Sequence, residues 1–144
     1  MKVVYPVIFT DVENNILIEV PDLEIYTQAN DAYKKKGTLA DAVMMARDAI
    51  GLSCISMEDA GKEIPSARNI TEIDIKNGAF YDEGESFVSV VDVDLVAYRQ
   101  KNDLKMVRRN VTLPNWLNRE AEAAHINVSR VLQEALMTTL NLVK

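Results

Sequence analysis

The sequence predicts a mixed α+β protein made of a larger N-terminal part and a smaller C-terminal part. In the larger part, three short segments rich in β-branched and aromatic residues precede one segment with helical periodicity and one more β-rich segment. The smaller part has a different order, in which one alternating segment precedes two helical ones. We therefore expect a β-β-β-α-β domain followed by a β-α-α domain.

A hairpin is predicted at the start of the chain, from strands at residues 3–10 and 16–20. Residues 11–15 between them have turn chemistry, because the adjacent asparagines tolerate left-handed backbone conformations. Pro6 has no N–H and therefore favours an edge position or an irregularity in the first strand. A short third strand is expected at residues 25–28.

The central helix is predicted at residues 38–51, after a polar loop at 30–37 that contains Lys34-Lys35-Lys36. Thr38 is the expected N-cap, with Asp41 three residues on as in a capping box. One apolar stripe of this helix is formed by Leu39, Val43, Ala46 and Ile50. A second helical turn is expected from Ser56 to about Gly61.

The next predicted strand is residues 87–93, where nearly every residue is β-branched or aromatic. Residues 98–104 are charged and polar and are the expected linker. This places the domain boundary near Asn102, with domains at 1–102 and 103–144.

Charge is divided unevenly along the 144 residues. Residues 1–103 hold 10 Lys and Arg against 19 Asp and Glu, a net charge of −9, whereas residues 104–144 hold 6 against 3, a net charge of +3; together they give the −6 of the whole chain. The basic end suits phosphate, and the acidic body could attract a basic protein. We expect a cytoplasmic protein, because there is one cysteine, no segment built like a signal peptide and no run long enough to span a membrane.

The segment 106–114, MVRRNVTLP, alternates apolar and polar residues up to a proline. On a strand, Arg108, Asn110 and Thr112 would share one face and offer groups that read base edges in the major groove. The opposite face is aliphatic except for Arg109, which has the inward parity. A single strand of this kind needs a partner, and the simplest partner is the same strand of a second copy.

Two amphipathic helices are predicted after this strand. Pro114 suits the first turn of a helix, and Leu117, Ala121 and Ala124 recur at helical spacing. His125 lies at the corner between the helices, where a capping role is expected. Asn127 is the expected N-cap of the second helix, NVSRVLQEAL. The R-x-N-x-T row, the Leu-Pro junction and this helix resemble the ribbon-helix-helix DNA-binding fold from residue 105 to about 140.

The N-terminal part resembles the HicB-type antitoxins of bacterial type II toxin–antitoxin pairs. The resemblance rests on YPVIF at 5–9, VPDL at 20–23, Thr27-Gln28, the helix at 38–51 and Gly61 with Ile64-Pro65, in this order. It implies a pared-down ribonuclease H-like domain that binds a HicA-type toxin, a small enzyme that cleaves messenger RNA. Family members usually pass from T-Q-G-D almost directly into the helix, whereas this chain inserts residues up to Gly37.

Together, the two resemblances imply an antitoxin that occludes its toxin and represses its own operon as a homodimer. They leave open whether two dimers form a tetramer. Base contacts would come from Arg108, Asn110 and Thr112. The phosphate contacts would come from Arg109 and from the start of the last helix, at Asn127, Val128 and Ser129.

Two other functions are weighed against the antitoxin. One is a stand-alone ribbon-helix-helix regulator whose N-terminal domain binds a ligand or only oligomerises. The other is a metal-dependent nuclease, which would need converging carboxylates. Its candidates are Asp11, Glu19, Asp22 and Asp41, and nothing in their spacing calls for a metal. With no phosphate loop, no dinucleotide motif and a Cys54 expected to be a buried inert thiol, we expect no enzyme, no metal and no cofactor.

Overall fold

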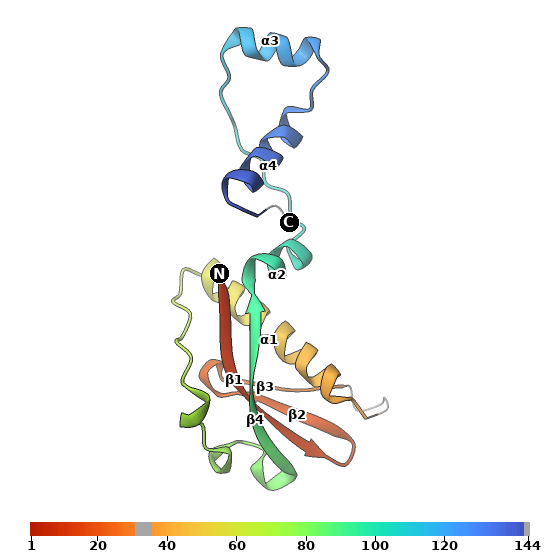
Figure 1. Cartoon of the computed structure of the whole chain (residues 1–144), viewed down its shortest axis with the longest axis vertical. Coiled ribbons are helices and arrows are strands. Elements are labelled where there is room, and N and C mark those ends of the chain that lie inside the picture. The colour runs from red at the N-terminus through yellow and green to blue at the C-terminus, as the bar shows by residue number, and fades with distance from the viewer. Residues whose placement is uncertain (31–35, 143–144) are drawn as a thin grey trace. The chain divides into compact units, whose positions relative to one another are not determined.

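The computed structural model of the chain describes residues 1–30 and 36–142 and divides into two units, Met1–Lys105 and Met106–Lys144. The described residues form one four-stranded antiparallel sheet and four α-helices (Figure 1), so the expected mixed α+β class is confirmed. Most of the polar loop at 30–37, including Lys34 and Lys35, lies outside the described residues.

β1 (Lys2–Val12) and β2 (Asn15–Val20) form the expected hairpin around a two-residue turn. Neither Asn14 nor Asn15 has a positive φ, so the turn forms without the left-handed conformation that asparagine tolerates. The Asn15 side chain is instead buried and donates to the carbonyl oxygen of Asn30 at 2.7 Å. This asparagine therefore stabilises the hairpin through its side chain rather than through its backbone conformation.

β3 (Ile25–Gln28) and β4 (Glu85–Asp94) complete the sheet in the order β3-β2-β1-β4. β1 is thus a central strand, and the edge position expected from Pro6 is wrong for the strand as a whole. However, the β1–β2 ladder begins only at Ile8 and Glu19, so the first half of β1 pairs with β4 alone. Pro6 lies in this half, where the strand is locally an edge.

α1 (Leu39–Asp59) covers one face of the sheet (Figure 1) and begins at the predicted capping box. The Thr38 hydroxyl accepts from the Asp41 N–H, and the Asp41 carboxylate accepts from the Thr38 N–H. These hydrogen bonds to Thr38, the backbone one first, lower the pKa of the Asp41 carboxyl below its usual value. The cap fixes where the helix starts against the sheet.

The predicted end of α1 near residue 51 and the separate turn from Ser56 are wrong, because the helix is continuous to Asp59. The buried stripe is also shifted by one position from the expected one at its start, since Leu39 is exposed. It runs through Ala42, Ala46, Ile50 and Cys54. Burial of this stripe outweighs the helix-breaking tendency of Gly51, which lies in the middle of the helix.

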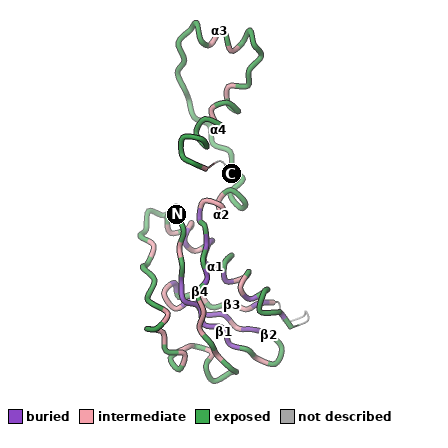
Figure 2. Tube along the Cα trace, in the orientation of Figure 1, coloured by how far each residue is buried: buried purple, intermediate pink, exposed green. Residues whose placement is uncertain are grey.

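The core lies between α1 and the facing side of the sheet, where Figure 2 shows the buried residues. Its buried members are Tyr5, Val7, Phe9, Ile16, Ile18, Val20, Leu23, Ala29, Ala42, Ala46, Ile50, Cys54, Val91, Val93 and Leu95. Cys54 is buried as predicted, although it lies within the helix and not after it. Burial raises the pKa of its thiol, so the reactive thiolate is disfavoured.

The opposite face of the sheet is partly covered by residues 68–84, where Gly78 lies close to Ile8 and Glu19. This segment contains three short 3-10 helices at Ile70–Glu72, Ile75–Asn77 and Tyr81–Glu83. The buried Glu19 carboxylate accepts from the Ala79 N–H at 2.8 Å and so holds this segment on the sheet. This hydrogen bond gives the buried carboxylate a structural role.

α2 (Leu95–Asn102) occupies the stretch expected to be a linker, so that prediction is wrong. Asp94 caps the helix by accepting from the N–H groups of Val96 and Ala97. Tyr98 lies over Gly51 of α1, where a methyl group would come within 2.5 Å of the Tyr98 ring. The polar composition of α2 reflects its exposed side, while this tyrosine docks the helix on α1.

The C-terminal unit contains α3 (Asn115–Ala123) and α4 (Val128–Thr139), close to the predicted helices. His125 adopts a left-handed conformation with φ of 54° just after α3. Its N–H donates to Glu122, and the next N–H, of Ile126, donates to Ala121, which is the Schellman pattern of helix ends. The capping role expected for His125 is confirmed. In the described part of the chain, no helix has the length and apolar character needed to cross a membrane.

Gly51→Ala should destabilise the N-terminal unit, although alanine normally favours a helix by about 1 kcal/mol. The added methyl would overlap the Tyr98 ring and lower the free energy of unfolding by about 1–3 kcal/mol. Chemical denaturation of the single variants and of Gly51→Ala combined with Tyr98→Ala measures the coupling. Gly51→Ala should cost nothing in the Tyr98→Ala background; an equal cost in both backgrounds would contradict this docking.

Stability should fall between about pH 10 and pH 12 because burial, followed by the hydrogen bond to Asp48, raises the pKa of Tyr98 to about 12. Below pH 10 the tyrosine is neutral in both states and its contribution is complete. Between the two values only the unfolded chain ionises, so the contribution is lost. Tyr98→Phe should lose less stability over this range than the wild type, as measured by denaturation at each pH. Tyr26→Phe, at an exposed ring, is the control; an unchanged slope in Tyr98→Phe contradicts the prediction.

Candidate nucleic-acid and protein interfaces

The residues predicted to read bases, Arg108, Asn110 and Thr112, are exposed and lie between α2 and α3. No strand is assigned in this segment of the single chain. A strand requires a hydrogen-bonded neighbour, and the predicted neighbour is a second copy. Within the described ranges no group hydrogen-bonds to these three side chains, so their polar groups are available to an external ligand.

The predicted phosphate contacts lie at the start of α4. Asn127 is its N-cap, as expected, and its side-chain oxygen accepts from the Arg130 N–H at 3.1 Å. The N–H groups of Val128 and Ser129 belong to the first turn and have no acceptor within the helix. Free N–H groups at a helix N-terminus, together with the helix dipole, favour a negatively charged ligand. Arg109, assigned to the same backbone contacts, is exposed.

The C-terminal unit has no core of its own. None of residues 106–142 is buried, as Figure 2 shows by the lack of purple in this unit. Large apolar side chains lie open on both helices, with Trp116 67% exposed, Val131 52% and Leu140 62%. A unit of this size cannot offset its conformational entropy without burying such groups. The apolar faces therefore require another surface to cover them.

The carboxylates weighed for metal chemistry each have a structural partner. Asp11 lies 2.6 Å from Nζ of Lys36, and Asp22 lies 2.6 Å from Nε of Arg68. Glu19 accepts from the Ala79 N–H, and Asp41 accepts from the Thr38 N–H in the cap of α1. No group of three or more metal-ligating side chains occurs among residues 1–30 and 36–142.

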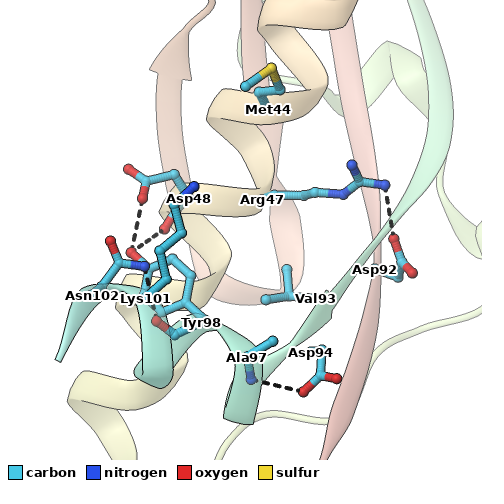
Figure 3. Close-up of a pocket in the computed structure, with 10 residues that line it drawn as sticks. All are labelled: Met44, Arg47, Asp48, Asp92, Val93, Asp94, Ala97, Tyr98, Lys101 and Asn102. Atoms are coloured by element: carbon cyan, nitrogen blue, oxygen red, sulfur yellow. Dashed lines mark hydrogen bonds and ion pairs between the residues drawn. The ribbon is translucent and has the colours of Figure 1, made fainter. Parts of the chain in front are cut away.

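A groove of about 430 Å³ lies beside β4 between α1 and α2, as Figure 3 shows. Its apolar surface comes from Met44, Val93 and Ala97. Its polar surface comes from Arg47, Asp48, Asp92, Asp94, Tyr98, Lys101 and Asn102. The sequence pattern does not predict this groove, because it predicts a linker at residues 98–104, whereas α2 forms one wall of the groove.

Two polar contacts shape the groove (Figure 3). The Tyr98 hydroxyl donates to the Asp48 carboxylate at 2.9 Å, which fixes α2 against α1. Arg47 of α1 reaches the carboxylate of Asp92 on β4 at 3.1 Å. Both members of this ion pair are more than half exposed, so the pair contributes little to stability and can exchange partners. The walls of the groove are therefore fixed by the contact between α1 and α2, whereas the ion pair between Arg47 and Asp92 can be replaced by contacts with a ligand.

The family model for the HicB-like antitoxin of bacterial toxin–antitoxin systems matches residues 5–135. Among solved structures, a chain of a toxin–antitoxin complex from Streptococcus pneumoniae is similar, with a TM-score of 0.57, 22% sequence identity, and coverage of 96% of this chain and 99% of that chain. The antitoxin HicB of Burkholderia pseudomallei gives a TM-score of 0.48 at 20% identity, with 98% of each chain covered. No match is found among curated proteins. Since the family model covers most of its length, this chain belongs to the HicB-like antitoxin family of bacterial toxin–antitoxin systems.

Proposed function

We propose that the chain neutralises a HicA-type toxin with its N-terminal unit and represses its own operon with its C-terminal unit. Family membership supports a toxin partner, and so does the similar Streptococcus pneumoniae chain, which comes from a toxin–antitoxin complex. The observation that carries the division of labour is the charge, −9 over residues 1–103 and +3 over residues 104–144. An acidic body repels DNA, whereas the basic end attracts it.

In the proposed repressor, residues 106–113 of two chains pair as an antiparallel ribbon that enters the major groove. Arg108, Asn110 and Thr112 then face the bases, where arginine favours guanine and asparagine favours adenine. The opposite face, with Val107, Val111 and Leu113, covers the open apolar faces of α3 and α4. The lack of any buried residue in 106–142 supports this dimer, because the unit otherwise has no core.

Phosphates on either side of the ribbon would meet the start of α4. The N–H groups of Val128 and Ser129, oriented by the Asn127 cap, bind one phosphate. Arg109, with the inward parity, serves the backbone rather than a base. These contacts would position the ribbon without distinguishing bases, so their loss should lower the binding affinity for all DNA sequences alike.

The N-terminal unit acts by covering the toxin. A toxin that cleaves RNA needs a basic surface to hold its substrate. An acidic surface that occupies this site competes with RNA directly, so the antitoxin needs no catalysis of its own. Two bodies joined by one C-terminal dimer would hold two toxins, and pairing of such dimers would give a tetramer.

Arg108→Ala should weaken binding to DNA upstream of its own gene by about 1–3 kcal/mol and relax specificity at one base position. The measurement is equilibrium binding of the full chain to operator and unrelated DNA across a salt series. Arg119→Ala is the matched control, because it removes one exposed positive charge from α3. Equal losses for the two variants on both DNAs would contradict base reading by Arg108.

A chain ending at Lys105 should still neutralise the toxin and should lose operator binding. This unit contains the whole core and ends after α2, so it should fold alone. Toxin inhibition in an RNA-cleavage assay and operator binding by gel shift test the two activities, with circular dichroism as the folding control. A folded chain of this length that fails to bind toxin would refute the division of labour.

A further inference from the structure

β4 leaves one long edge of the sheet unpaired. It has ten residues and lies at the end of the order β3-β2-β1-β4, whereas β3 at the other end has only four. In the part of the chain that the structure describes, no strand pairs with the outer edge of β4. β4 has no lysine and no proline, the residues that commonly protect such edges. A row of free N–H and C=O groups is a template for a strand from another chain.

The hydrogen-bond pattern identifies the outward-facing groups. The Leu95 N–H donates to the Met1 carbonyl oxygen at 3.0 Å, which continues the β1–β4 register by one residue. In an antiparallel ladder, hydrogen-bonded pairs alternate with pairs whose groups point away. The even-numbered residues of β4, including Val88, Val90 and Asp92, therefore direct their N–H and C=O groups outward. Pro6 pairs with Val90, so the residue without an N–H falls where none is needed.

The groove described above lies directly beside this edge. Val93 of β4 and Met44 of α1 both line it, so it is on the α1 side of the sheet. A strand added to the edge would place alternate side chains on that side, next to these residues. The edge would supply main-chain hydrogen bonds and the groove would select the side chains. On the strand itself, Phe87 and Val90 are 42% and 52% exposed, apolar area that an added strand would cover.

Charge indicates which strand fits. β4 carries Glu85, Asp92 and Asp94 and no positive residue. The groove is lined by three carboxylates, Asp48, Asp92 and Asp94, against two cations, Arg47 and Lys101. A second copy of β4 would bring the same acidic residues to this edge and so carry a repulsive cost. A basic strand meets complementary charge, and it can take Asp92 from the exposed pair with Arg47.

We infer that the toxin binds by adding one basic strand to the free edge of β4, with alternate side chains in the groove between α1 and α2. This inference rests on the proposed neutralisation of a toxin by the N-terminal unit. It assigns the contact to the even-numbered backbone groups of β4 and to the groove. The toxin strand would then be the fifth strand of the antitoxin sheet.

Amide hydrogen exchange of the full chain, alone and with catalytically inactive toxin, tests this pairing without any mutation. The amides of Val88, Val90 and Asp92 should exchange freely in the antitoxin alone and gain protection in the complex. Those of Ser89 and Val91, which already face β1, should change little. Protection of the even-numbered amides before the toxin is added would show that another copy occupies the edge and would overturn the proposal.

Val90→Pro tests the same edge by removing one outward N–H while the ladder with β1 is kept. Toxin affinity should fall about tenfold or more. Val90→Thr keeps the N–H and the branched shape, and its affinity should match the wild type. Circular dichroism and operator binding check that both variants remain folded and dimeric. Equal affinity of Val90→Pro and the wild type overturns the strand addition.

Ala97→Phe tests the groove, because the larger side chain would fill it, while Ala97→Ser keeps its size. The first variant should lose toxin affinity and the second should not. The failure of this inference is distinct from the failure of the proposed function. If the wild type binds toxin and none of the variants changes its affinity, strand addition at β4 is rejected and the proposed antitoxin function stands. If the wild type binds no toxin, both proposals are rejected.

Discussion

Packing of α1 on one face of the sheet is the interaction on which the N-terminal unit depends. The helix contributes a stripe of small and medium side chains, Ala42, Ala46, Ile50 and Cys54, all fully buried. Two alanines let the helix axis approach the strands closely, so large residues such as Tyr5 and Phe9 fill the space beside them. The same helix then provides Gly51 as the seat for Tyr98, so α2 depends on α1 for its position.

The two units solve the problem of stability in different ways. The N-terminal unit buries its own apolar residues between a sheet and a helix. The C-terminal unit leaves its apolar residues exposed, with no buried residue in 106–142. In the proposed dimer, the core of this unit would form only when two chains meet. Folding of the proposed DNA-reading surface and assembly of the repressor would then be one event.

The acidic residues of the N-terminal unit include three on β4, the strand with the unpaired edge. Long exposed strand edges invite unwanted pairing, and acidic residues on β4 disfavour pairing between identical chains while leaving the edge attractive to a basic partner. The exposed ion pair of Arg47 with Asp92 beside the edge costs little to exchange. In the proposed complex, the ten residues of β4 would both select the partner strand by charge and supply the free backbone groups that pair with it.

Sequence alone determined the elements whose causes are local. The capping box at Thr38, the hairpin, the N-cap at Asn127 and the cap at His125 depend on residues within a few positions of one another, and the structure confirms each of them. The sequence also predicted the antitoxin family, because short motifs in a fixed order can be recognised without knowing which residues are in contact. The ribbon and its base contacts rest on the sequence pattern and stay a prediction.

Only the tertiary structure decided the features that depend on distant residues. Residues 98–102 are polar, as in a linker, yet they form a helix because Tyr98 packs on Gly51, which is distant along the chain. α1 continues past Gly51 because the stripe on its buried side continues to Cys54. Pro6 lies in a central strand because the hairpin partner ends before it. In each case, burial against a distant element outweighs the local preference, and a pattern read along the chain contains no record of that element.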